Sequence, residues 1–297
     1  MLINTKCDVL EKVGDARENI AIFACKGKSL EMMKFIGNRQ DLTKALHEQN
    51  YEGWNVVHYA AKSGNCDILE YLIGEMKVDC INESTNKKKN CLHTACEAGH
   101  YEACKYLVKS APRLLNLSDK DGNHAGHYAA MKGTVKIIKF LKDRGLDLEV
   151  RNNENVNILH VACLYAHLDL CKYLANEFPK LLKETTKRSE NAALFVMERK
   201  DDEDKRIKIL TYLVNRGLDV YHVSASGKSA LYLACRNRSL VHCEHLLKHY
   251  PKFYDMDEGD MSSIEAADGD SRIKLLFSKY DPKLKTSRFF KNICIIL

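Results

Sequence analysis

The sequence predicts an all-α fold, a solenoid of about eight stacked helix pairs joined by short β-hairpin fingers. Histidines recur at intervals of 35, 34 and 33 residues, at His58, His93, His127 and His160. Each is followed two positions later by alanine, in a run of small and apolar residues that favours helix. The second half of each repeat has apolar residues at helical spacing, as in residues 137–141. Such units can cover their apolar stripes only by stacking on their neighbours.

The clearest copies of the repeat resemble a known family. They lie at residues 55–64, 90–99, 124–133 and 157–166. In each copy, His is followed two positions later by Ala, and three of the copies end in Gly. This pattern resembles the Thr-Pro-Leu-His-x-Ala-Ala-x-x-Gly core of ankyrin repeats. The resemblance implies a turn and two short helices per unit, with structural histidines that tie each inner helix to the neighbouring turn by hydrogen bonds. The sequence departs from the family at the proline, which is missing from every copy.

Weaker copies extend the register over nearly the whole chain. A first copy lies at residues 22–25, a seventh at 231–235 and a shortened last copy at 264–267. The sequence therefore divides into an N-terminal segment, a repeat array and a tail, at residues 1–14, 15–278 and 279–297. No block of residues is left for a separate catalytic domain, so we predict a protein without enzymatic activity and without a cofactor.

The sixth copy, at residues 191–197, is degenerate. Neither Leu194 nor Phe195 supplies a histidine, so the register is ambiguous by one residue. The acidic run 201–204 lengthens the turn between its two helices. Because the stability of a repeat array depends on each unit and its two neighbours, we predict that this is the internal unit that opens first.

Three finger turns contain glycine where a tight hairpin needs a positive φ. These are residues 50–53, 119–122 and 224–227. The third, fifth and sixth units lack this glycine. We therefore expect longer or less regular hairpins in those units.

The cysteines and histidines do not predict a metal site. The sequence holds 12 cysteines but begins without a secretory signal, which favours a reduced, cytoplasmic location. Cys163, His167 and Cys171 have ligand-like spacing, and histidines crowd residues 242–249. The repeat register instead places both cysteines in buried helix positions, and structural zinc sites need four converging ligands. The net charge of +6 is modest, so we expect no nucleic-acid partner.

The tail predicts an attachment to a membrane. Cys294-Ile295-Ile296-Leu297 fits the Cys-aliphatic-aliphatic-X prenylation pattern, and the final leucine favours geranylgeranylation of Cys294. Candidate membrane contacts precede it, at Lys283, Lys285, Arg288, Phe289, Phe290 and Lys291. One lipid chain with such basic residues would hold the array at the cytoplasmic face of a membrane. Two alternatives remain: an apolar tail packed on the last repeat, or a hydrophobic C-terminal ligand for another domain.

The family resemblance implies a non-catalytic scaffold or adaptor. Fingers and inner helices would form a concave groove that binds a protein partner with little ordering cost. We predict exposed finger residues as contacts: Tyr51, Trp54, Lys87, Lys88, Lys89, Asn123, Asn153 and Tyr221. The alternative is a soluble regulatory subunit or adaptor, for example of a ligase or a channel.

Overall fold

The computed structural model describes residues 17–254, 263–267 and 269–280. These residues form α-helices and short single-turn helices, with no β-strand among them, which confirms the all-α class. The chain divides into two compact units, Met1–Asn153 and Glu154–Leu297. Within the described ranges, every helix is too short or too polar to cross a bilayer.

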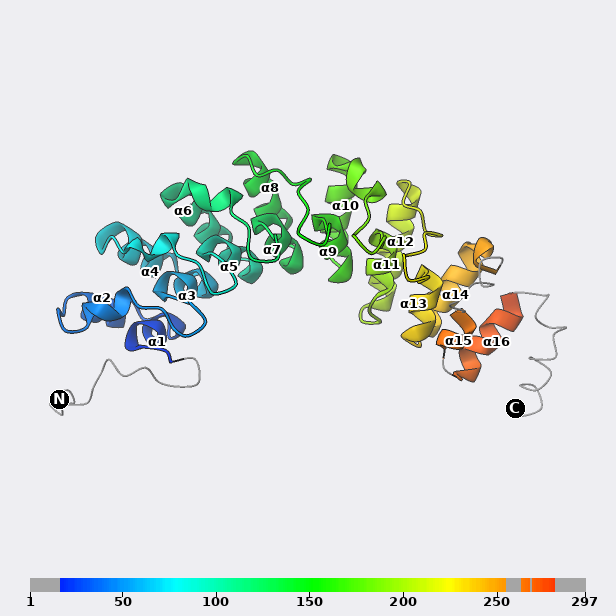
Figure 1. Cartoon of the computed structure of the whole chain (residues 1–297), viewed down its shortest axis with the longest axis horizontal. Coiled ribbons are helices and arrows are strands. Elements are labelled where there is room, and N and C mark those ends of the chain that lie inside the picture. The colour runs from blue at the N-terminus through cyan, green and yellow to red at the C-terminus, as the bar shows by residue number, and fades with distance from the viewer. Residues whose placement is uncertain (1–16, 255–262, 268, 281–297) are drawn as a thin grey trace. The chain divides into compact units, whose positions relative to one another are not determined.

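The first unit is built from helix pairs. The inner helices are α1 (Ile20–Lys26), α3 (Val56–Ser63), α5 (Cys91–Ala98) and α7 (Ala125–Lys132). The outer helices are α2 (Leu30–Gly37), α4 (Cys66–Glu70), α6 (Tyr101–Ser110) and α8 (Val135–Asp143), with short turns η1 (Thr43–Leu46), η2 (Tyr71–Glu75), η3 (Asp79–Asn82) and η4 (Pro112–Asn116). Figure 1 shows the inner helices side by side, each with its outer helix beyond it.

The second unit repeats the same arrangement. Its inner helices are α9 (Ile158–Leu164), α11 (Ala192–Met197), α13 (Ala230–Arg236) and α15 (Ser263–Ala266). Its outer helices are α10 (Leu168–Glu177), α12 (Glu203–Asn215), α14 (Leu240–His249) and α16 (Ser271–Tyr280), with turns η5 (Pro179–Lys183) and η6 (Pro251–Tyr254). Successive inner helices pack on one another, as do successive outer helices.

The repeated histidines lie at equivalent positions near the start of the inner helices. The Oδ1 atom of Asn55 accepts a hydrogen bond from the His58 backbone N at 3.0 Å, and Asn55 N donates to His58 Nδ1 at 3.4 Å. Because Nδ1 accepts, the neutral ring carries its proton on Nε2, which lies 3.1 Å from the Lys89 carbonyl oxygen. His93 and His160 make the same reciprocal contacts. Their Nε2 atoms lie 3.0 and 3.2 Å from the carbonyl oxygens of Leu117 and Glu184.

The fourth ring, His127, lies at the same helix position, where its Nδ1 accepts from the backbone N of His124 at 3.2 Å. Each of these side chains is fully buried. Histidine therefore caps its own helix and, in the units of His58, His93 and His160, also joins it to the next repeat.

Small residues let the two helices of a pair approach each other closely. Buried thiols meet between inner and outer helices, with Sγ–Sγ distances of 3.6 Å for Cys96 and Cys104 and 3.8 Å for Cys163 and Cys171.

Burial raises the pKa of the Cys25 thiol to about 12, so this thiol stays protonated and is a poor metal ligand. The part of the chain that the structure describes contains no cluster of three metal-ligating side chains.

The fingers are short hairpin turns. Two backbone hydrogen bonds close each of them, in residues 50–54, 85–89, 119–123, 186–190 and 224–228. The backbone N of the first residue donates to the carbonyl of the fifth at 2.9–3.0 Å, and the backbone N of the fourth donates to the carbonyl of the first at 2.7–3.2 Å. This is the geometry of a short β-hairpin loop. No β-strand flanks the loops in the described residues, so each finger consists of the turn alone.

The fingers without glycine have the same turn as the others. Gly53, Gly122 and Gly227 have φ values of 78°, 81° and 77°. The equivalent residues Lys88, Asn155 and Ser189 have φ values of 56°, 58° and 53°. The expectation of longer or irregular hairpins is therefore wrong, because these residues adopt the left-handed conformation at a cost of ~1–2 kcal/mol each.

We expect Gly122→Ala to destabilise the first unit by about 2 kcal/mol, because it adds a steric clash to the backbone strain. A Cβ atom at Gly122 would lie 2.7 Å from the backbone N of Asn153. Gly145 provides the matched control, since it has φ +93° but nothing within 4 Å of an added Cβ. Urea unfolding should give a loss of about 1 kcal/mol for Gly145→Ala. Equal losses of unfolding free energy for the two variants would show that the close contact between Gly122 and Asn153 contributes nothing to the destabilisation.

The sixth repeat has a clear register in the structure. Asn191 caps α11, and Leu194 stands where the other units have histidine. The turn between α11 and α12 spans residues 198–202, compared with residues 64–65 between α3 and α4. The acidic run therefore lengthens this turn, as the sequence predicts.

A buried arginine, which the sequence analysis missed, connects this repeat to the one before it. Arg206 of α12 is 0% exposed. Its Nη2 donates to the Leu164 carbonyl at 2.9 Å, and its Nη1 donates to the Val196 carbonyl at 2.8 Å and the Cys163 carbonyl at 3.3 Å. The guanidinium thus satisfies the carbonyls of Leu164 and Val196 at the ends of α9 and α11, and it shares the Cys163 carbonyl with the backbone N of Ala166. Its charge is balanced by the side chain of Asp201.

Candidate functional site

The best candidate for a binding site lies on the fingers and inner helices of the first unit. We define the finger surface as residues 50–54, 85–89 and 119–123 together with the exposed side of α3, α5 and α7. Backbone hydrogen bonds join each finger to the next, at 2.9 Å from Asn86 N to Glu52 O and 2.8 Å from Lys120 N to Lys87 O. The fingers therefore present their side chains at fixed spacing.

Lysines lie over aromatic rings in the middle of this surface. The ring centroid of Trp54 lies 5.3 Å from Lys62 Nζ and 5.8 Å from Lys89 Nζ. Lys89 Nζ also lies 4.5 Å from the ring centroid of Tyr128. We call Trp54, Lys62, Lys89 and Tyr128 the lysine–aromatic cluster. Its members come from two fingers and two inner helices, and each cation is close enough to be attracted to a ring face.

Carboxylates near this cluster are held by hydrogen bonds within the protein. Asp119 accepts from the Tyr128 hydroxyl at 2.7 Å and from Asn123 Nδ2 at 3.0 Å. Burial opposes ionisation of Asp119, but these hydrogen bonds lower its pKa overall. Glu18 is similar: burial opposes its ionisation, whereas hydrogen bonds from Lys26 and Tyr59 lower its pKa. Both carboxylates are thus kept charged and directed inward.

Only some of the predicted contact residues are exposed. The exposed ones are Tyr51, Lys87, Lys88 and Asn153. Trp54 and Lys89 are partly buried in the lysine–aromatic cluster, and Lys89 is ion-paired with Glu97. The prediction that every member of the set is exposed is therefore wrong, although the role of these residues as partner contacts stays a prediction.

Two other predicted contacts are partly buried for different reasons. Asn123 closes its own finger, donating from its backbone N to Asp119 Oδ1 at 2.7 Å. Tyr221 lies in the second unit, where its ring centroid is 5.0 Å from that of Phe253. Tyr221 therefore packs between repeats and is poorly placed to contact a partner.

Sequence reasoning missed two residues of the finger surface, Lys62 and Tyr128. Lys62 follows His58 by four positions and Tyr128 follows His127 by one, so both lie on the side of the inner helix next to the fingers. Counting from each histidine could have identified them.

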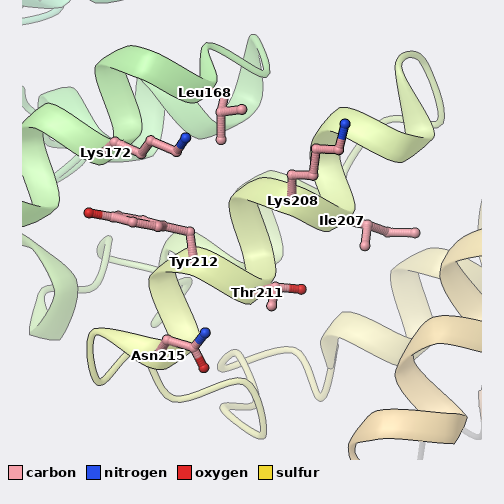
Figure 2. Close-up of a pocket in the computed structure, with 7 residues that line it drawn as sticks. All are labelled: Leu168, Lys172, Ile207, Lys208, Thr211, Tyr212 and Asn215. Atoms are coloured by element: carbon pink, nitrogen blue, oxygen red, sulfur yellow. The ribbon is translucent and has the colours of Figure 1, made fainter.

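The outer helices carry a shallow groove of about 370 Å³ in the second unit. It lies between α10 and α12, and its lining includes Leu168, Ile207 and Tyr212 (Figure 2). Lys172 Nζ lies 5.8 Å from the ring centroid of Tyr212. This lining contains no pair of groups suited to acid–base or nucleophilic catalysis. A small ligand would meet a mainly apolar wall with lysines at its rim.

The predicted lipidation site and membrane contacts lie outside the described residues. They are Cys294, Lys283, Lys285, Arg288, Phe289, Phe290 and Lys291. Their roles therefore stay predictions from the sequence.

Known proteins are similar to this chain over part of its length. It is 30% identical over 154 residues to the target of rapamycin complex 2 subunit AVO2 of Saccharomyces cerevisiae, covering 51% of this chain and 35% of that protein. It is 29% identical over 140 residues to mouse synphilin-1, covering 44% of this chain and 14% of that protein. The chain thus spans about a third or less of the length of these relatives.

The fold and the repeat sequence both match known ankyrin repeats. The crystal structure of the human ASB11 ankyrin repeat domain superposes with a TM-score of 0.61 at 18% identity, covering 78% of this chain and 99% of that domain. The sequence model for ankyrin repeats matches three overlapping stretches, at residues 1–82, 21–116 and 92–185. Ankyrin repeats typically act as protein-interaction modules. Since the matched stretches cover more than half of the chain, the protein belongs to the ankyrin-repeat family.

Proposed function

We propose that this chain is a non-catalytic adaptor and that a protein partner binds to the finger surface. The observation that carries the proposal is the set of exposed side chains Tyr51, Lys87 and Lys88, which stand beside the lysine–aromatic cluster on fingers joined by backbone hydrogen bonds. Aromatic and basic side chains held in a fixed arrangement dominate many protein interfaces, because little entropy is lost when they bind. Similarity to a protein named as a subunit of a larger complex supports the same role.

Affinity capture from the native cell, followed by quantitative mass spectrometry, tests this proposal. The test variant is Tyr51→Ala with Lys88→Glu, because both side chains are exposed on adjacent fingers. We expect it to lose at least about 90% of the specifically captured partner, which corresponds to a change of ~1.4 kcal/mol or more in binding free energy.

The matched control is Tyr106→Ala with Lys109→Glu on the outer helix α6, which makes the same chemical changes away from the fingers. This variant should capture the partner as the unchanged chain does. If the outer-helix variant lost the partner while the finger variant retained it, the proposed binding face would be wrong.

A second proposal concerns the tail and rests on its sequence. We infer that Cys294 is prenylated and that Lys283, Lys285, Arg288 and Lys291 add electrostatic attraction to an anionic membrane. Intact-mass measurement on protein from its native cell tests the modification. We expect the mass of a geranylgeranyl chain, and release of Cys294→Ser from the membrane fraction. An unmodified chain with unchanged distribution of the serine variant would leave the packed-tail or C-terminal-ligand alternative.

A further inference from the structure

We propose that the finger surface recognises a short acidic segment of its partner, with carboxylates placed to meet a group of unpaired lysines. This inference rests on the proposed function and specifies the chemistry of the partner. The lysine group consists of Lys62, Lys87, Lys88 and Lys120, all of which are exposed.

The four lysines of this group lack ion-pair partners within the described residues, unlike other lysines nearby. Lys26 and Lys89 form ion pairs with Glu18 and Glu97. In the described ranges, by contrast, no carboxylate oxygen lies within 4.0 Å of the amine of Lys62, Lys87, Lys88 or Lys120. The nearby carboxylate of Asp119 is occupied by Tyr128 and Asn123. These four amines therefore have no ion-pair partner among the described residues, although the Glu18 carboxylate interacts with Lys62 at longer range.

The lysine group is held in a fixed geometry. The backbone hydrogen bond between Lys120 N and Lys87 O holds the tips of two fingers together at 2.8 Å. Lys62 is placed by Trp54, whose ring centroid lies 5.3 Å from its Nζ. An extended segment lying along the fingers would thus meet cations on two fingers and one inner helix, with the partly buried indole of Trp54 between them. Such an arrangement suits carboxylates that alternate with apolar side chains.

The charges around the lysine group favour a short peptide over a nucleic acid. Exposed carboxylates flank the lysine group on the fingers, at Glu52 in the finger before Lys87 and at Asp121 next to Lys120 in the same finger. These charges would repel a continuous phosphate backbone that ran along the row. A short acidic segment can place its charges between them.

Trp54 provides a local probe, because it is the single tryptophan in the sequence. The full chain would be titrated with a synthetic peptide of about 12 residues that alternates glutamate and leucine, and with a version in which glutamine replaces glutamate. We expect the acidic peptide to change Trp54 emission saturably and the neutral peptide to bind at least about tenfold more weakly. Raising the salt concentration from about 50 to about 300 mM should strongly weaken the binding of the acidic peptide.

Lysine substitutions test whether the acidic peptide binds to the finger surface or to basic residues elsewhere on the chain. The double variant Lys62→Gln with Lys88→Gln should bind the acidic peptide about tenfold more weakly than the unchanged chain does. The matched control is Lys109→Gln with Lys136→Gln on α6 and α8, which removes the same charge from the outer helices. Its affinity should equal that of the unchanged chain. Equal weakening by both variants, or no response of Trp54 to the acidic peptide, would overturn the inference.

Two further outcomes distinguish this inference from the proposed function. If a captured partner is lost on Tyr51→Ala with Lys88→Glu but retained by Lys62→Gln with Lys88→Gln at all salt concentrations, the finger surface binds a partner that is not acidic. In that case the adaptor proposal stands and the acidic-segment inference fails. If single-stranded RNA changes Trp54 emission at concentrations as low as the acidic peptide does, the surface is a general polyanion site and the inference also fails.

Discussion

Replacing Arg206 by methionine should lower the free energy of unfolding by about 4 kcal/mol. Methionine keeps a long side chain in the space but donates no hydrogen bonds. The carbonyls of Leu164 and Val196, at the ends of α9 and α11, would then lose their donor, while the Cys163 carbonyl keeps its hydrogen bond from the backbone N of Ala166. Each buried carbonyl left without a partner costs ~1–3 kcal/mol. Urea unfolding followed by circular dichroism measures this change.

Arg236 provides the control, because it is also an arginine in an ion pair of the second unit. Its side chain is 37% exposed and lies 2.9 Å from Glu198. Solvent screens such a pair, so Arg236→Met should cost no more than about 1 kcal/mol. If Arg206→Met cost as little as Arg236→Met, the buried arginine would not be the link between the fifth and sixth repeats that we infer.

Acidification from pH 7 to pH 5 should destabilise the protein by about 2 kcal/mol for each of the capping histidines His58 and His93. Burial lowers the pKa of His58 and of His93 from 6.5 to about 4. Between these two values the unfolded chain binds a proton that the folded chain excludes. Stability is therefore complete above pH 6.5 and falls as the pH falls toward 4. Urea unfolding across this range measures the slope.

The variant His58→Gln tests whether His58 causes part of this loss of stability on acidification. The variant should be less stable at pH 7, because the capping contact and the bond to the Lys89 carbonyl are altered. Its pH dependence should be smaller by about one proton per molecule between pH 5 and 6. His47→Gln, at an exposed histidine, should keep the full dependence. An unchanged slope in His58→Gln would contradict a neutral, buried His58.

The repeat architecture could be predicted from the sequence because its signals are local. The histidine, its alanine and the apolar stripe recur in each unit, and each has a direct role in capping or packing. Finger shape was harder to predict. Lys88 and Ser189 adopt a left-handed conformation that side chains rarely accept, and each closes its own finger by a backbone hydrogen bond to Thr85 or Thr186.

The role of Arg206 could not be predicted, because it depends on contacts distant in sequence. It lies in a charged stretch that suggests a solvated surface. Its guanidinium nevertheless donates to the Leu164 carbonyl, which is 42 residues away in the sequence. The lysine–aromatic cluster is similar. Trp54 and Lys89 come from different fingers, and only the stacking of repeats brings them together.

Photo-crosslinking shows whether a protein partner binds to the finger surface. A photoreactive residue would replace Tyr51 on a finger or Tyr106 on the outer helix α6, in the full chain expressed in its native cell. The account predicts a defined crosslinked protein from position 51 and none from position 106. A partner crosslinked from position 106 and not from position 51 would contradict it.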